Sequence, residues 1–272
     1  SQNKHLDKVH VVLGKKSCDL DSFISALTYA YYLEKVSPSN ILCLPVLNIT
    51  RREFCYYKET EIILEELNIP ESLHVFRDEI SLNQLNSEGK LSLTLLNSRA
   101  LASEDKSLES AVVRVICPEE QCDGNLEFTE STSSHVAKEL LQKAPELITL
   151  QLAHLLRGSI LSKITAMDLE KITEEQEQVL SSLEEKFPEL LPREDIITVL
   201  QGAQFQADGL RIEEAMLKDL KEVSDGEIKV AVSTVYMNLE PGRIMRTCGV
   251  SDILLREDIA GGWSRFFASK KF

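Results

Sequence analysis

The sequence predicts an α/β fold in which helices wrap a parallel sheet, followed by a mainly helical region. Strand-like and helix-like segments alternate through the first half of the chain, which is typical of a parallel sheet. From Ser131 onward the apolar residues recur with helical spacing. The 272 residues, of which 43% are hydrophobic, suffice to bury a sizeable core.

The first half divides into short segments of strand or helix character. In the segment from Ser22, the residues Phe23, Leu27 and Tyr31 have spacing i, i+4 and i+8, which predicts a helix with one apolar face against the sheet. The segments, in order, are VHVVLG (9–14), the helix from Ser22, ILCLPVL (41–47), TEIILEELN (60–68), LHVF (73–76), LSLTLLN (91–97) and AVVRVIC (111–117).

The second half is predicted to be helical with one clear strand. Pro145 suits the first turn of a helix, and Pro188 and Pro192 indicate a domain boundary. We therefore expect a first domain over 1–187, a partial second domain over 188–239 and a disordered tail over 240–272, which has no sustained period. Predicted helices are 133–143, 145–164, 174–187, 193–205 and 212–223, and the predicted strand is 227–239.

Composition excludes several classes of function. With 44 acidic and 30 basic residues the net charge is −14, which repels nucleic acid and anionic membranes. A phosphate ligand would need a local cluster of cations or a metal. The six cysteines form no CxxC, and no signal peptide or apolar run of about 18 residues is present, so we expect a reduced, soluble, cytoplasmic protein without a membrane span.

Two aspartates follow the first predicted strand, at the position where ligands bind in parallel α/β folds. Asp19 and Asp21 are spaced so that both carboxylates can converge on Mg²⁺ or Mn²⁺, which take oxygen ligands. The alternative is that Asp21 or Ser22 caps the helix that follows. A zinc site from Cys117, Cys122 and His135 is incomplete, and ordinary thiols are the better interpretation.

The stretch CDLDS with its apolar helix, together with DEISLNQLNSEGKLSLTLL and GSILSKITAMDLEK, resembles the Prune branch of the DHH phosphoesterase superfamily. The resemblance runs over about residues 9 to 239. It implies a Rossmann-like DHH domain with a helical connector, and a smaller second α/β domain that is truncated in this chain. It also implies two Mn²⁺ or Mg²⁺ ions that hydrolyse pyrophosphate or short polyphosphate.

Most positions that match the family's metal ligands carry other residues in this chain. The His or Asn expected before Asp19 and Asp21 is Lys15, and the aspartate expected in the last helix of the motif set is Lys163. Asp-based motifs at the ends of two later strands are replaced by uncharged or basic residues, namely Asn97, Ser98, Arg99, Cys117 and Pro118.

Asp19 and Asp21 alone cannot hold two metal ions, because each ion needs several ligands. We hypothesise that Lys15, Lys163 or both pair with the two aspartates and stand in for the missing ions. The alternative is that both lysines point into solvent, as most lysines do.

The sequence therefore predicts a catalytically degenerate domain that needs no cofactor and acts as an interaction or regulatory module. The resemblance suggests protein partners in growth or survival signalling. One alternative is a weak Mn²⁺- or Mg²⁺-dependent hydrolase using Asp19 and Asp21 with Asn97 as a third ligand. Another is a metal-free module in which Lys15, Arg99 and Lys163 bind a phosphate anion, helped by a helix N-terminus.

Overall fold

The computed structural model describes residues 7–16, 19–57, 60–61, 64, 69–117, 131–165, 172–205, 221–224, 228–235, 252–258 and 263–271. The chain forms two compact units. The first comprises residues 1–54 and 59–200, and the second residues 55–58 and 201–272. The sequence placed the division at residue 187 instead. Most of the helix α7 (Arg193–Phe205) belongs to the first unit because it buries Ile196 and Leu200 there.

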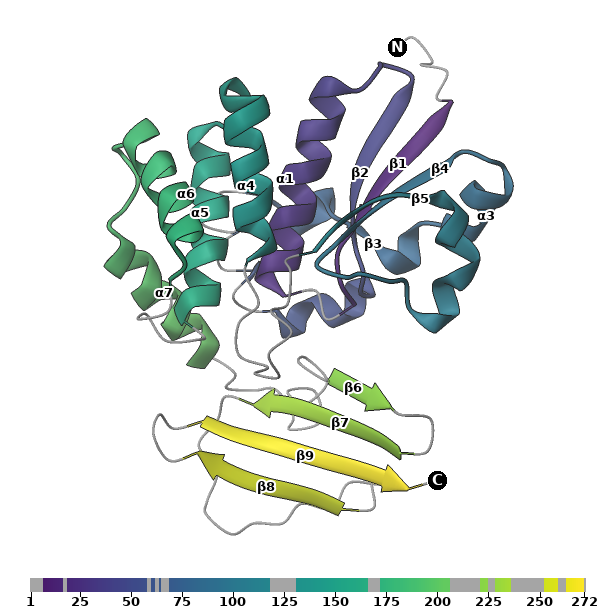
Figure 1. Ribbon diagram of the computed structural model, residues 1–272, viewed down its shortest axis with the longest axis vertical. Coiled ribbons are helices and arrows are strands. Elements are labelled where there is room, and N and C mark those ends of the chain that lie inside the picture. Colours follow the sequence, from purple (N-terminus) through teal and green to yellow (C-terminus); the bar gives the residue numbers. More distant parts are fainter. Residues whose placement is uncertain are drawn as a thin grey trace. The chain divides into compact units, whose positions relative to one another are not determined.

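The first unit is built on a five-stranded sheet in the order β3-β2-β1-β4-β5, and every pair of neighbouring strands is parallel (Figure 1). This confirms the predicted α/β fold with a parallel sheet. The strands match the predicted segments closely, and they are β1 (Lys8–Leu13), β2 (Ile41–Leu47), β3 (Val75–Phe76), β4 (Leu91–Leu96) and β5 (Val112–Ile116).

The helix α1 (Leu20–Val36) contacts β1, β2 and β4 on one side and the helices α4 (Thr132–Lys143) and α5 (Leu150–Thr165) on the other. It is therefore buried on more than the single face that the sequence predicted. Phe23, Tyr29 and Ala30 are buried, whereas Leu27 and Tyr31 of the predicted apolar face are only partly buried. Contacts on both sides explain why Ser25 and Thr28 are also buried in this helix.

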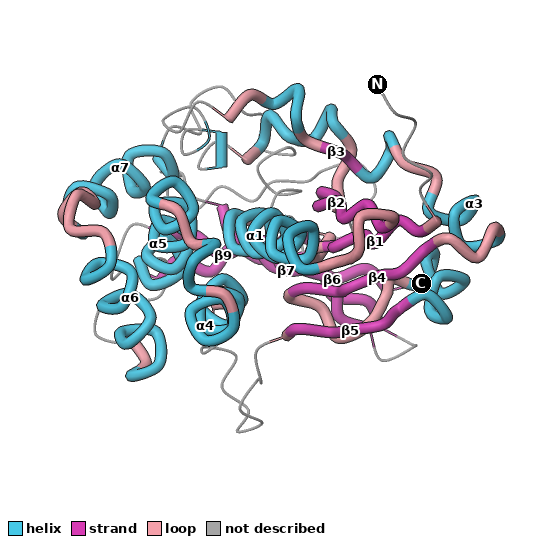
Figure 2. Tube along the Cα trace, turned by 90° about the horizontal axis from the view of Figure 1, so that it is seen from above, coloured by secondary structure: helices cyan, strands magenta, loops and turns pink. Residues whose placement is uncertain are grey.

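The opposite face of the sheet carries α3 (Leu82–Ser87) and the 3₁₀ helix η4 (Ser103–Ala111), which lie across the sheet from α1 in Figures 1 and 2. Leu82 of α3 and Leu108 of η4 are fully buried against β1 and β4. The apolar core is thus divided by the sheet into two layers, as expected for an α/β fold.

Beyond α1, the helices α4 and α5 are followed by α6 (Glu174–Lys186) and α7 (Figure 1). Pro145 opens the short 3₁₀ helix η5 (Pro145–Leu147) and not α5, which begins at Leu150. Arg157 of α5 is only 2% exposed and donates to Glu184 of α6, which also pairs with Arg193 of α7. This ion-pair chain joins the last three helices of the unit.

The loops after β2 and β3 form the 3₁₀ helices η1 (Arg51–Tyr56), η2 (Glu71–Leu73) and η3 (Arg77–Glu79). Arg51 pairs with Glu71 and Glu79, and its guanidinium lies 4.4 Å from the centre of the Phe76 ring. Arg51 therefore connects two loops of the protein through its ion pairs.

The second unit contains a four-stranded antiparallel sheet in the order β6-β7-β9-β8. Its strands are β6 (Lys221–Ser224), β7 (Ile228–Val235), β8 (Asp252–Asp258) and β9 (Trp263–Lys271). The sequence predicted a helix through residue 223 and a disordered tail from residue 240. Backbone pairing accounts for both differences: β6 pairs with β7, and β9 pairs with β7 and β8. Such pairing stabilises strands in segments that lack a strong local pattern.

Most of the predicted helix 212–223 lies outside the described residues, as do parts of the predicted segments 60–68 and 227–239. Among the helices that the structure describes, none combines the length and the apolar character needed to cross a membrane.

Candidate functional site

The candidate site lies at the carboxyl ends of β1 and β4, where α1 begins. Gly14 follows β1 and contacts Ser22 so closely that a Cβ atom on Gly14 would lie 3.2 Å from the Ser22 side chain. The amide of Asn48, after β2, donates to the Gly14 carbonyl over 3.1 Å. These contacts place the acidic segment against the first turn of α1, and they account for a glycine at the end of β1.

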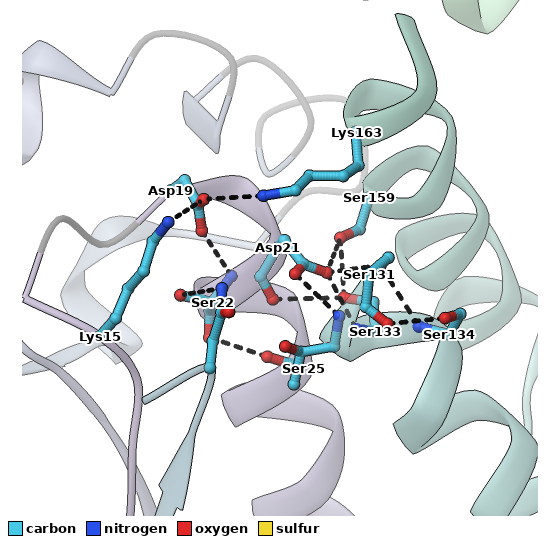
Figure 3. A network of polar contacts seen from close by, with 12 residues as sticks. Lys15, Asp19, Asp21, Ser22, Ser25, Ser131, Ser133, Ser134, Ser159 and Lys163 are labelled. Carbon is cyan, nitrogen blue, oxygen red and sulfur yellow. Dashed lines mark hydrogen bonds and ion pairs between the residues drawn. The ribbon is translucent and has the colours of Figure 1, made fainter. Parts of the chain in front are cut away.

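Asp19 is the N-terminal cap of α1 and the centre of a charge cluster (Figure 3). Its Oδ1 accepts a hydrogen bond from the Ser22 N–H over 2.9 Å. Its Oδ2 lies 2.6 Å from Nζ of Lys15 and 3.7 Å from Nζ of Lys163. Both lysines therefore point toward this carboxylate, as the pairing hypothesis expects, and not into solvent as in the alternative.

The two lysines determine the charge state of Asp19. Burial alone would raise the pKa of its carboxyl group. The positive charges of Lys15 and Lys163, together with the hydrogen bonds from Lys15 and the Ser22 N–H, outweigh that effect and hold the pKa well below its usual range. At neutral pH the Asp19 carboxylate is therefore ionised, and it lies between two ammonium groups.

Asp21 has a different set of partners. It is 3% exposed, and its Oδ1 accepts hydrogen bonds from the Ser131 hydroxyl at 2.6 Å and the Ser133 N–H at 2.9 Å. Its Oδ2 accepts from the Thr132 N–H at 2.9 Å, and the Ser159 hydroxyl of α5 lies 3.4 Å from Oδ1 (Figure 3). The predicted cap of α1 by Asp21 or Ser22 is wrong, because Asp19 caps α1 and Asp21 binds the first turn of α4.

Asn97 lies at the same edge, directly after β4. It is the non-glycine residue with positive φ, 56°, in the described part of the chain. Its side-chain amide donates to the Ser22 hydroxyl over 3.2 Å, so the loop after β4 is attached to the first turn of α1. Ser98 donates to the carbonyl of Ala100, and Arg99 is exposed to solvent.

The remaining predicted positions lie apart from these contacts. Cys117 follows β5 and is a partly buried free thiol. Pro118 and Cys122 lie outside the described residues, so the structure does not place the complete set of degenerate motif positions. The His135 ring contacts the Ser131 carbonyl.

The residues present do not fit a centre of two divalent ions. Mn²⁺ and Mg²⁺ favour several oxygen ligands, and a two-metal centre requires such a set around each ion. Here the Asp19 carboxylate already pairs with the ammonium groups of Lys15 and Lys163, and Asp21 is buried against α4. Across the described ranges no three His, Cys, Asp or Glu side chains lie close enough to share a metal.

The same geometry limits anion binding. Lys15 and Lys163 share one carboxylate, which leaves a net positive charge for a phosphate anion. The neighbouring Lys16 pairs with Glu104 at 2.6 Å. A phosphate would therefore have to compete with Asp19 for both ammonium groups.

Sequence reasoning missed the residues that hold Asp21. Ser131, Ser133 and Ser159 are 110, 112 and 138 positions away from it in the chain. A local signal did exist, because the STSS stretch at residue 131 has the composition of a helix N-terminus. Nothing in that stretch indicated that the acceptor would come from α1.

Comparison with known proteins supports the expected relationship. No family model matches the chain. The chain is 67% identical over 239 residues to the mouse protein named protein prune homolog 2, and the match covers 88% of this chain and 8% of that protein. It is 40% identical over 243 residues to the Bos taurus exopolyphosphatase PRUNE1 and 39% identical to the Homo sapiens one. These two matches each cover 85% of this chain and 53% of the relative.

The chain therefore spans about half the length of the exopolyphosphatase relatives and a small part of the mouse protein. Among solved structures it is similar to a putative family II inorganic pyrophosphatase of Methanococcus jannaschii. The TM-score is 0.57 with 19% sequence identity, and the match covers 82% of this chain and 69% of that one. At this level of identity the likeness shows the fold.

Proposed function

Because the chain belongs to the Prune family of the DHH phosphoesterase superfamily, we propose that it is a member whose hydrolytic centre has become a metal-independent structural site. The domain then acts as an interaction or regulatory module. We propose protein partners and a cytoplasmic location for it, with growth or survival signalling as the setting that the family suggests.

The observation that carries this proposal is the position of two lysines on one aspartate. Lys15 and Lys163 are 23% and 19% exposed, and both ammonium groups lie within 4 Å of Oδ2 of Asp19. A divalent cation at that carboxylate would meet two positive charges at short range, in surroundings that screen charges less than water does. The site already has its counter-charge without a metal.

A second candidate function is weak hydrolysis of pyrophosphate or short polyphosphate with Mn²⁺ or Mg²⁺. It is favoured by the names of the bovine and human relatives, which are exopolyphosphatases. In this chain Asp19, Asp21 and Asn97 lie at the start of α1, and their carboxylate and amide oxygens are of the kind that these cations bind. Such activity would require both carboxylates to leave their present partners.

A phosphate-release assay tests the two candidates. The chain is incubated with Mn²⁺ or Mg²⁺ and with pyrophosphate or tripolyphosphate, beside the bovine PRUNE1 relative as a positive control. We expect no release above that of the metal alone. A turnover that Asp19→Asn abolishes would establish the hydrolase instead.

A restored variant gives the matched comparison. It returns acidic or imidazole groups to the degenerate positions through Asn97→Asp, Cys117→Asp, Pro118→His and Lys163→Asp. Gain of turnover in this variant, with none in the parent chain, would support the view that substitution disabled the centre. Calorimetric titration of the parent with tripolyphosphate in the absence of metal tests the anion-binding alternative, for which heat of binding lost in Lys15→Ala is the positive result.

A further inference from the structure

The carboxylate of Asp21 joins three helices that are distant in sequence. It belongs to the first turn of α1, it accepts two N–H groups and one hydroxyl from the start of α4, and the Ser159 hydroxyl approaches it from α5. In return, the Ser133 hydroxyl donates to the Asp21 carbonyl over 3.2 Å and lies 2.7 Å from the Ser159 hydroxyl. Figure 3 shows these side chains converging from the three helices.

We propose that Asp21 serves this chain as an acceptor for the first N–H groups of α4, whose own cap is Ser131, and so as a clamp between α1, α4 and α5. This use replaces the metal ligation that the family resemblance implies. The proposal rests on the proposed function, because it gives the second aspartate of the motif a use that requires no metal. It goes beyond that function, since it predicts what the fold loses when this carboxylate is removed.

The first argument is that the start of α4 requires an acceptor. The first N–H groups of a helix have no partner within the helix, and here the donors of Thr132 and Ser133 are buried. Both N–H groups donate hydrogen bonds to the Asp21 carboxylate. A carboxylate at a helix N-terminus also gains from the helix dipole. Removing it would leave buried donors without partners, which is costly.

The second argument is that both oxygens are in use. Oδ2 accepts from Thr132, while Oδ1 accepts from Ser131 and Ser133. A metal ion at Asp21 would have to replace these donors, although hardly any of the residue is reachable from solvent. Metal exclusion at Asp21 therefore has a different cause from that at Asp19, where positive charge is responsible.

The third argument comes from a matched pair of side chains in the same turn. The Ser131 hydroxyl donates to Asp21 over 2.6 Å, and it also accepts from the Ser134 N–H. The Thr132 hydroxyl is equally buried but has no hydrogen-bond partner. Ser131→Ala thus removes part of the clamp together with the Ser131 cap of α4, whereas Thr132→Val removes a hydroxyl of the same turn and leaves both intact.

The test is thermal unfolding of the whole chain. Asp21→Asn removes the charge and turns an N–H₂ group toward helix donors, so we expect Tm to fall by about 5 to 10 °C. Ser131→Ala should lower Tm by a few degrees, and Thr132→Val should leave it unchanged or slightly raised. Ser131→Ala and Thr132→Val together keep the proposal testable if Asp21 variants fail to fold.

Chemical rescue makes the test specific for a carboxylate. In Asp21→Gly the side chain is absent, and formate can occupy its place at the start of α4. At a formate concentration about tenfold above its Kd, we expect Tm of this variant to rise by about 4 °C more than in sodium chloride of equal ionic strength. The parent chain, whose own carboxylate fills the site, should show no such difference.

Three results would each overturn the clamp. The first is an Asp21→Asn variant as stable as the parent, and the second is a formate effect no larger than that of chloride. The third is a rise in the Tm of the parent with Mn²⁺ that Asp21→Asn abolishes, because that would make Asp21 a metal ligand. These readouts are independent of phosphate release, so failure of the clamp and failure of the proposed function are distinguishable.

Discussion

The ammonium group of Lys15 and the carboxylate of Asp19 lie 2.6 Å apart, four positions from each other in the sequence. The pair stands at the end of β1, where the family resemblance implies a metal ligand in place of the lysine. Lys163 approaches the same carboxylate oxygen from α5. Two lysine ammonium groups thus balance the charge of Asp19, and the proposed metal-independent site rests on this arrangement.

Removing Lys15 should destabilise the protein modestly. The Lys15–Asp19 pair is partly exposed, with 36% of the Asp19 side chain accessible, so we expect Lys15→Ala to cost about 1 kcal/mol and Lys163→Ala less. Urea denaturation gives both values. Lys16→Ala is the control, since its pair with Glu104 is exposed on both sides, and its effect should stay within about 0.5 kcal/mol. Equal stability of all four proteins would contradict the pairing.

Acid should erase the contribution of this cluster. The pKa of Asp19 is lower in the folded protein than its ordinary value of 3.8, so its ionisation stabilises the fold above that pH. The contribution is lost as pH falls below 3.8 toward the folded-state value. The stability difference between the parent chain and a Lys15→Ala, Lys163→Ala double variant should therefore shrink from pH 6 to pH 3. A difference that is constant over this range would contradict the lowered pKa.

His74 should produce a separate pH dependence at higher pH. Its ring is buried against Phe23, Phe54 and Phe76, and its Nε2 has no hydrogen-bond partner. Burial lowers its pKa from 6.5, which outweighs the opposite influence of the nearby Glu71, while the charge of Arg51 adds to the lowering. The neutral ring is thus favoured in the folded state, and its stability contribution is complete above pH 6.5 and declines below it.

We expect His74→Phe to flatten the decline in Tm between pH 7 and pH 5. A residual slope should remain, because burial also lowers the pKa of His10, whose ring contacts the Thr94 hydroxyl at 2.8 Å. Thermal unfolding at four or five pH values measures both slopes. If the parent and variant slopes coincide, His74 is not the titrating group.

The ion-pair chain of α5, α6 and α7 should depend mainly on Glu184. This carboxylate pairs with the fully buried Arg157 and with Arg193, whereas Glu177 pairs with Arg193 alone among these arginines. Glu184→Gln leaves a buried guanidinium without its charge partner, and we expect a loss of about 3 kcal/mol. Glu177→Gln should cost about 1 kcal/mol or less. Denaturant unfolding compares the two, and the reverse order would contradict this account of Arg157.

Local sequence patterns predicted most of the first unit. The predicted segments 41–47 and 193–205 coincide with β2 and α7, because each has a clear apolar pattern and polar or proline boundaries. The hypothesis that Lys15 pairs with Asp19 came from the family resemblance, which implies a metal ligand at the position of Lys15. These features depend on residues close together in the chain, which is where sequence reasoning is strongest.

Features that depend on distant contacts could not be predicted. The partners of Asp21 lie on α4 and α5, and a carboxylate before a helix looks the same in sequence whether it caps its own helix or another. The strands β8 and β9 form in a segment without a sustained hydrophobic period. They are stabilised by backbone pairing with each other and with β7, which the local sequence does not reveal. Most of α7 belongs to the first unit because Ile196 and Leu200 are buried there, which local sequence does not indicate.

Equilibrium titration with Mn²⁺, followed by the electron paramagnetic resonance signal of the free ion, tests the central claim most directly. The account predicts that the parent chain, Asp19→Asn and Asp21→Asn remove the same small amount of Mn²⁺ from solution. Two ions bound per parent chain, with fewer in either variant, would contradict it.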